Sequence, residues 1–182
     1  MNFLNKQYTQ EGLKLALPVM LTQVGQVSVN LFDNIIVGKL LGAQALASVS
    51  LGNALFFSIF VLALGFSFAI PPLVSEANSQ KKHDVINSVF RHGFVINLGI
   101  GILLMIILLS ALPLIYHLDQ PKEIIPNTIS FLSIMAFTMI PFMMFQTLRE
   151  VSEGLSFTIG VTKATIIANV INIVLNYVFI KG

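Results

Sequence analysis

The chain has 182 residues, of which 55% are hydrophobic and 10% are charged. Soluble domains carry about 25% charged residues, so this composition is that of a membrane protein. A net charge of +2 is too small to favour nucleic acid as a partner, and the absence of cysteine excludes disulfides, thiol chemistry and cysteine-ligated metals.

Charged residues are absent from five stretches, and each stretch can supply a helix that crosses a bilayer. These stretches are 15–32, 40–75, 92–118, 124–148 and 164–180. A spanning helix needs roughly 20 apolar residues, and an unbroken apolar run is typical of a helix rather than of a barrel strand. We therefore predict an all-α polytopic membrane helix bundle with a cytoplasmic N-terminus. Its transmembrane helices are expected near 14–37, 46–74, 91–116, 124–148 and 160–180.

Asp33 is the only charged residue in the run 15–37 of the first predicted helix. A carboxylate within a bilayer is costly and usually faces a bundle interior or a water-filled cavity. Gln23, Gln26 and Asn30 precede Asp33 at spacings that put the four side chains on one helix face. In the alternative interpretation, Asp33 lies near the helix end and reaches the outer interface, because Lys39 follows shortly after it.

The second predicted helix is longer than one membrane crossing requires, so we expect it to be tilted, bent or projecting from the membrane. Pro71 and Pro72 close this helix. Pro113 lies near the end of the third helix and Pro141 lies inside the fourth. Each proline removes a backbone hydrogen bond and favours a kink, although proline is also common in membrane helices that have no hinge.

The loop charges predict the orientation of the chain. Lysine and arginine accumulate on the cytoplasmic side of membrane proteins. Seven basic residues would share one side with the N-terminus, whereas Lys39, Lys122 and Lys181 would lie on the other. We therefore expect loops 75–84 and 149–156 in the cytoplasm and loop 117–123 outside. The seven are Lys6, Lys14, Lys81, Lys82, Arg91, Arg149 and Lys163.

The fifth predicted helix repeats the pattern of the first. Thr162, Thr165, Asn169, Asn172 and Asn176 recur at helical spacing and form one polar face. Two helices with polar faces indicate a shared internal cavity. Amides and hydroxyls beside a carboxylate can support a proton-carrying site, coordinate a small cation or bind a substrate. Alternatively, these side chains only join the helices, at about 0.6 kcal/mol per hydrogen bond.

No pattern in the sequence indicates catalysis, and we expect that the protein is not an enzyme. His83, His92 and His117 show no metal-ligand spacing. The sequence contains no phosphate-binding loop and no hydrolase or metalloprotease motif. Glu150 and Glu153 flank a cytoplasmic helix end with Arg149, so we interpret the three residues as a surface ion-pair cluster.

Several segments taken together resemble the N-terminal part of a multidrug and toxic compound extrusion transporter. The opening segment has Leu-Pro at its start and Asp33 downstream, and the closing segment has Asn-x-x-x-Asn-Tyr-x-Phe. The resemblance covers nearly the whole chain in order. Its segments are 15–24, 32–38, 40–52, 149–154 and 169–182.

The resemblance implies a cation-coupled antiporter that exports amphipathic, often cationic, drugs. It assigns Asp33, Asn172 and Asn176 to a proton or cation site. The remaining residues of the two polar faces, among them Asn169, are expected to line the cavity because of their spacing and not because of the resemblance. Some family members carry a second carboxylate on the fifth helix, where this chain has asparagine, so the coupling ion stays open between proton and sodium. No cofactor is expected besides the transported ion. The expected cavity-lining residues are Gln23, Gln26, Asn30, Thr165 and Asn169.

The resemblance also implies partners and a location. Members of the family have two lobes of six helices and are about twice as long as this chain, so residues 1–182 correspond to a partial N-lobe. The expected partners are membrane lipid, a small-molecule drug and the missing second lobe, and the expected location is the inner (plasma) membrane, crossed several times. Without the second lobe, the chain should not transport alone.

Two alternatives remain open. One is a flippase of the related superfamily that moves lipids or lipid-linked oligosaccharides, although basic residues touch the predicted spans only at their cytoplasmic ends. The other is a structural membrane protein without transport. The downstream reading frame discriminates between the classes, because seven further helices would support a transporter and a natural stop at Gly182 would support a small membrane protein.

Overall fold

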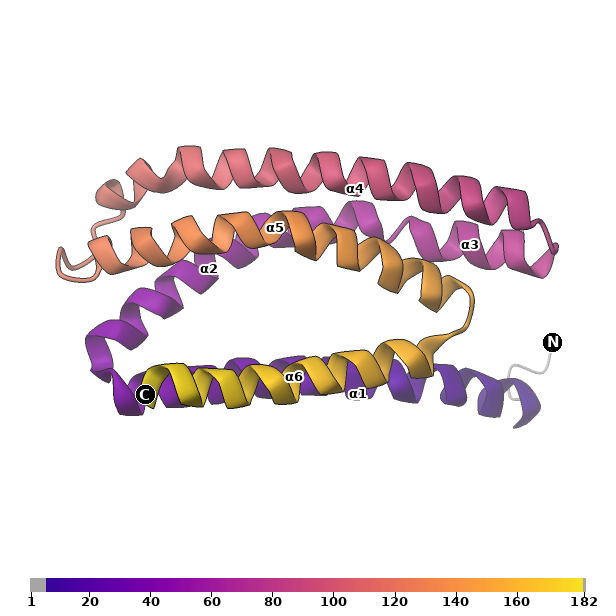
Figure 1. The fold of residues 1–182 in the computed structure, drawn as a ribbon, viewed down its shortest axis with the longest axis horizontal. Helices are drawn as coiled ribbons and strands as arrows, with labels where there is room; N and C mark the ends of the chain where they lie inside the picture. Colours follow the sequence, from indigo (N-terminus) through magenta and orange to yellow (C-terminus); the bar gives the residue numbers. More distant parts are fainter. Residues whose placement is uncertain (1–5, 182) are drawn as a thin grey trace.

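The structure is a computed structural model that describes residues 6–181 and, within that range, contains helices and no strands (Figure 1). The description leaves out the side chains at 6–11, 14, 15, 18, 19, 22, 23, 26, 180 and 181. The elements are α1 (Lys6–Leu40), α2 (Gly42–Ser67), α3 (Ile70–Ser79), α4 (His83–Ala111), the 3-10 helix η1 (Leu112–His117), α5 (Ile125–Gly154) and α6 (Thr158–Lys181).

The helices form two layers (Figure 1). The larger layer contains α2, α3, α4 and α5, and α5 packs against each of the other three. The smaller layer is the pair α1 and α6, which lie side by side. The two layers contact each other mainly where the chain passes between them, from α1 to α2 and from α5 to α6.

The buried core follows one face of α5. Leu132, Ala136, Met139 and Met143 are almost fully buried, and they recur every three or four residues along that helix. Gly101 of α4 lies against the backbone of α5, where an added Cβ would lie 3.1 Å from the Met139 carbonyl oxygen. Small residues at such positions let membrane helices approach closely, so α4 and α5 pack backbone against backbone there.

The helix predicted at 46–74 is interrupted. α2 ends at Ser67 and α3 begins at Ile70, with Pro71 and Pro72 in the first turn of α3. Proline has no N–H and cannot continue a helix, but it fits the first turn of a new one. The expected bend is therefore present, but the two prolines start a second helix and do not close the first, which ends at Ser67.

Four helical stretches in the described part of the chain are long and apolar enough to cross a membrane, judged by length and composition. α1 covers the span predicted at 14–37 and is 35 residues long. The fold is the predicted all-α membrane helix bundle, and the chain is a multi-pass membrane protein. The four stretches are Gly42–Ser79, His83–His117, Ile125–Gly154 and Thr158–Phe179.

The helices extend beyond their predicted ends, so the predicted loops are too long. Loop 75–84 is reduced to a turn at 80–82, and loop 149–156 is reduced to 155–157. Between α1 and α2 only Leu41 is left, and the next residue, Gly42, turns the chain with a φ of +87°. The predictions placed helix ends at the first charged residues, but a helix can continue into water with charged side chains on its surface.

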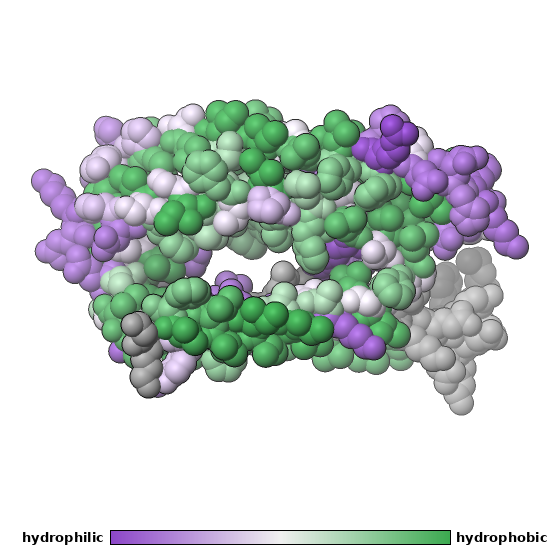
Figure 2. Space-filling model, viewed as in Figure 1, coloured by the Kyte–Doolittle hydropathy of each residue, from purple (hydrophilic) through white to green (hydrophobic). Residues whose placement is uncertain are grey.

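The structure groups the chain connections at two ends of the bundle (Figure 1). The start of α1 and the turns α3–α4 and α5–α6 lie at one end, whereas the turn α1–α2, the loop before α5 and the end of α6 lie at the other. Figure 2 shows a hydrophobic belt between hydrophilic ends. This grouping is the one that the loop charges predicted.

We expect the α3–α4 end to face the cytoplasm, because Lys81 and Lys82 form its turn. The chain has no native cysteine, and Ser79 is exposed, so Ser79→Cys provides a single labelling site. An impermeant thiol reagent should not label this variant in intact cells and should label it after permeabilisation.

The matched control is Gln120→Cys, an exposed position in the loop at the opposite end. It should react in intact cells under the same conditions. The reverse pattern, with Ser79→Cys labelled and Gln120→Cys protected, would show that the predicted orientation is wrong.

Candidate functional site

A chain of hydrogen bonds joins Asp33 of α1 to two asparagines of α6. The Asn176 Nδ2 atom donates to Asp33 Oδ1 at 2.6 Å and to Asn172 Oδ1 at 3.1 Å. Asp33 and Asn176 are half-buried, and Asn172 is exposed. Two oxygen atoms from different helices therefore converge on one amide nitrogen.

α1 and α6 run in parallel, and their polar faces meet along more than one turn. Asn169 lies two turns before Asn176, and its Nδ2 atom would be 3.1 Å from a Cβ added at Gly25. Gly25 in turn lies about two turns before Asp33. The helix pair thus keeps one register from Gly25–Asn169 to Asp33–Asn176, and the missing side chain of Gly25 makes room for Asn169.

The other residues predicted to line the cavity lie in different environments. Thr165 is buried, and its Oγ1 atom has no hydrogen-bond partner among the described residues. Asn30 is exposed on α1, one turn before Asp33. The side chains of Gln23 and Gln26 lie outside the described part of the chain. The structure therefore brings Asp33, Asn172 and Asn176 together where α1 meets α6.

An opening separates the α1–α6 pair from the larger layer, as the space-filling view shows (Figure 2). Among the described residues, the two layers meet mainly through the contacts of α1 with α2 and of α5 with α6. Asp33 belongs to the smaller layer, where it is hydrogen-bonded to Asn176 of α6.

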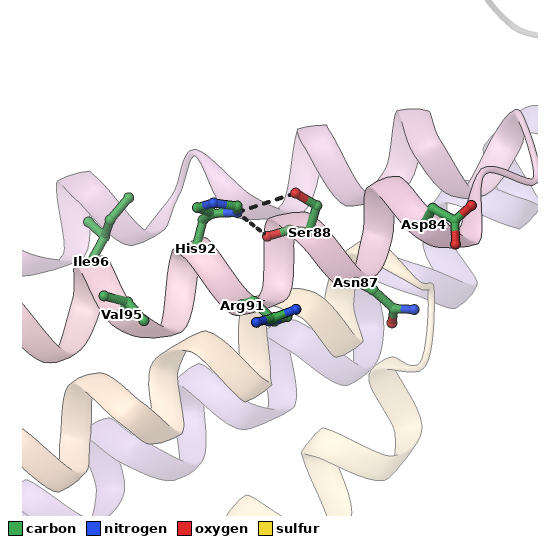
Figure 3. A pocket seen from close by; sticks show the side chains of 7 residues that line it. All are labelled: Asp84, Asn87, Ser88, Arg91, His92, Val95 and Ile96. Carbon is green, nitrogen blue, oxygen red and sulfur yellow. Dashed lines mark hydrogen bonds between the residues drawn. The ribbon is translucent and has the colours of Figure 1, made fainter.

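A second polar region lies on the outer surface of α4 (Figure 3). It is a shallow pocket of about 460 Å³ whose lining residues all come from α4. The His92 Nδ1 atom is 2.8 Å from the Ser88 carbonyl oxygen, which accepts its hydrogen. All seven lining residues lie on one helix face, so the pocket is a surface groove. They are Asp84, Asn87, Ser88, Arg91, His92, Val95 and Ile96.

The interpretation of Glu150 as part of a surface ion-pair cluster is wrong. Arg149 and Glu153 do form an ion pair, with Nε to Oε1 at 2.8 Å, but Glu150 is buried and accepts a hydrogen bond from Gln146 Nε2. The pattern of buried side chains explains the difference, because Gln146 and Glu150 continue the helical spacing of Met139 along the core face of α5.

A family model described as MatE matches residues 18–178. The multidrug resistance protein NorM of Photobacterium profundum is 32% identical over 177 residues, which cover 97% of this chain and 39% of that protein. The multidrug resistance protein MdtK of Yersinia pestis is 28% identical over 171 residues, covering 93% of this chain and 37% of that protein. The chain thus spans about two fifths of the length of these relatives.

Two solved structures share the fold. One is an outward-facing multidrug resistance MATE family transporter of the MOP superfamily, with a TM-score of 0.85 and 22% identity over 92% of this chain and 37% of that chain. The other is a MOP superfamily transporter from Pyrococcus furiosus whose binding pocket has reversed polarity, described as suggesting a different function, with a TM-score of 0.84, 23% identity and the same two coverages.

Proposed function

The chain belongs to the multidrug and toxic compound extrusion (MatE) family, and from this premise we propose that it forms part of one lobe of a cation-coupled drug exporter in the inner (plasma) membrane. The names of NorM and MdtK support drug export. Because the chain spans about two fifths of such relatives, residues 1–182 would act together with further helices of a second lobe, not alone.

The hydrogen bonds around Asn176 carry the proposal of a coupling site. Asp33 Oδ1 and Asn172 Oδ1 both lie within hydrogen-bond distance of one Asn176 nitrogen. If the Asn176 amide turns over, its oxygen joins the other two. Three oxygens, one of them a carboxylate oxygen, are suitable ligands for a hard cation such as sodium.

The same arrangement suits a proton. A protonated Asp33 becomes a donor, and the turned Asn176 amide would offer it an oxygen acceptor. Either ion would neutralise Asp33, the one carboxylate among the described side chains of α1 and α6. In an exchange mechanism, a cationic drug and the coupling ion then compete for the same negative charge.

The test compares ethidium accumulation in cells that lack their own drug exporters. Expression of the complete reading frame that contains this chain should lower accumulation, and collapse of the sodium or proton gradient should restore it and so identify the ion. The 182-residue chain expressed alone should leave accumulation unchanged. A frame with seven further helices that leaves accumulation unchanged would contradict drug export.

Lipid transport is the alternative that the sequence left open, and the Pyrococcus furiosus structure, which matches the fold almost equally well, is described only as suggesting a different function. An anionic lipid headgroup would need basic residues within the cavity. Arg91 and Lys163 lie near the α3–α4 and α5–α6 turns, which leaves them far from Asp33 along the bundle. Drug export is therefore the function that the described residues support better.

A further inference from the structure

A second carboxylate is buried at the end of the bundle opposite Asp33. Glu150 lies one turn before the end of α5, and the residue is only 2% exposed. Gln146, one turn earlier and 1% exposed, donates its Nε2 hydrogen to Glu150 Oε1. The Gln146 Oε1 atom is buried and has no hydrogen-bond partner within the described residues. Buried polar atoms of this kind are rare in native proteins and call for a ligand or a water.

The break between α2 and α3 lies at the same level as this carboxylate. The Thr128 Oγ1 atom of α5 donates a hydrogen bond to the Ser48 carbonyl oxygen of α2, and the two residues are 80 positions apart in the sequence. Val74 of α3 and Gly154 of α5 lie against each other and are also 80 positions apart. Residues of α2 and α3 therefore lie beside the residues of α5 that follow them by 80 positions in the sequence. This offset places the Ser67–Ile70 junction beside the turn of α5 that carries Gln146 and Glu150.

The junction offers further oxygen atoms. Ser67 is fully buried, and its Oγ atom has no hydrogen-bond partner among the described residues. Pro71 and Pro72 lack an N–H, so the carbonyls of Ser67 and Phe68, four residues earlier, receive no helical hydrogen bond from them. Broken membrane helices use such carbonyls to coordinate cations.

The basic residue adjacent in sequence does not neutralise Glu150 through a salt bridge. Arg149 is ion-paired with Glu153, and the described residues provide Glu150 with no salt bridge of its own. One buried carboxylate, with the Gln146 Oε1 atom on the same helix unpaired among the described residues and the oxygens of the junction at the same level, favours a monovalent hard cation. Calcium usually takes six to eight oxygens with several carboxylates, and magnesium keeps most of its water.

We propose that Glu150, Gln146 and the α2–α3 junction at Ser67 form a binding site for a sodium-class monovalent cation. The cation would bridge α5 to the junction and hold this end of the bundle closed. The site is separate from Asp33, which lies near the other end of the molecule, and it does not depend on whether Asp33 couples transport.

The test measures thermal unfolding of the purified 182-residue chain in detergent at pH 8, in sodium chloride and in choline chloride of equal ionic strength. Asp33→Asn is used as the background, so that any response to sodium comes from elsewhere. In that background, sodium at about 100 times its Kd should raise the Tm by about 5–10 °C. Adding Glu150→Gln should remove the rise.

Two further variants keep the test decisive. Ser67→Ala removes only a hydroxyl and should fold, and it should raise the sodium concentration needed for half of the effect by about tenfold, the equivalent of one lost hydrogen bond. Glu76→Gln, an exposed carboxylate on α3, makes the same charge change and should leave the rise intact. No sodium response in the Asp33→Asn background, or an equal response with Glu150→Gln, would overturn the proposal.

Discussion

Asp33→Asn is expected to abolish export of ethidium by the complete transporter while leaving membrane insertion intact. The substitution keeps the shape of the side chain and removes the charge that the proposed coupling ion must neutralise. Asparagine offers the cation a neutral oxygen in place of a charged one, and a loss of about 1.5–3 kcal/mol, the size of a charge-assisted hydrogen bond, corresponds to a roughly 10- to 100-fold loss in cation affinity. Ethidium accumulation and the amount of protein in the membrane fraction measure the two expectations.

A charge exchange separates the role of the carboxylate from the role of the fold. Asp33→Asn combined with Asn176→Asp returns one negative charge to the other side of the same 2.6 Å hydrogen bond. We expect this double variant to recover part of the export. Asp119→Asn, an exposed residue in the loop before α5, should have no effect. Full export by Asp33→Asn alone would refute the coupling site.

The contact between Asp33 and the asparagines could be predicted from the sequence because two separate patterns agree. A single acid in an apolar run needs nearby donors. The asparagines on the fifth predicted helix formed a continuous polar face, and the loop charges placed the outer ends of both helices on one side of the membrane. The structure confirms the contact through Asn176. The role of the site in ion coupling is a proposal, and the double variant that exchanges Asp33 and Asn176 tests it.

The buried position of Glu150 could not be predicted in the same way. The charged residues Arg149, Glu150 and Glu153 follow one another closely, and such a cluster usually lies on a surface. The decisive fact is which face of α5 meets α3, and that depends on the break after Ser67. Local sequence indicated a bend at the prolines, but not the direction in which α3 leaves.

The contact between α5 and α3 is expected to be among the most sensitive in the chain. A Cβ added at Gly154 would lie 2.7 Å from the Val74 Cβ atom and 2.9 Å from the Pro71 carbonyl oxygen. Neither atom can move by a change of rotamer, because one is bonded directly to its Cα atom and the other belongs to the backbone. Gly154→Ala therefore requires the two helices to separate.

We expect Gly154→Ala to destabilise the 182-residue chain by about 1–3 kcal/mol, the usual cost of overpacking. At this chain length the loss corresponds to a fall in Tm of roughly 2–12 °C in detergent. The matched control is Gly65→Ala in α2, where an added Cβ meets nothing within 4 Å. Gly65→Ala should keep or slightly raise the Tm, because alanine favours a helix over glycine by about 1 kcal/mol.

Gly154→Ala also tests whether this contact positions the buried carboxylate. Gly154 lies one turn after Glu150 on the same face of α5, so a separation at Gly154 should move Glu150 away from the α2–α3 junction. The sodium-dependent rise in Tm should then shrink along with the Tm itself, whereas Gly65→Ala should leave that rise unchanged. An unaltered Tm for Gly154→Ala would mean that α3 and α5 do not pack at this distance, and the position assigned to the junction beside Glu150 would lose its support.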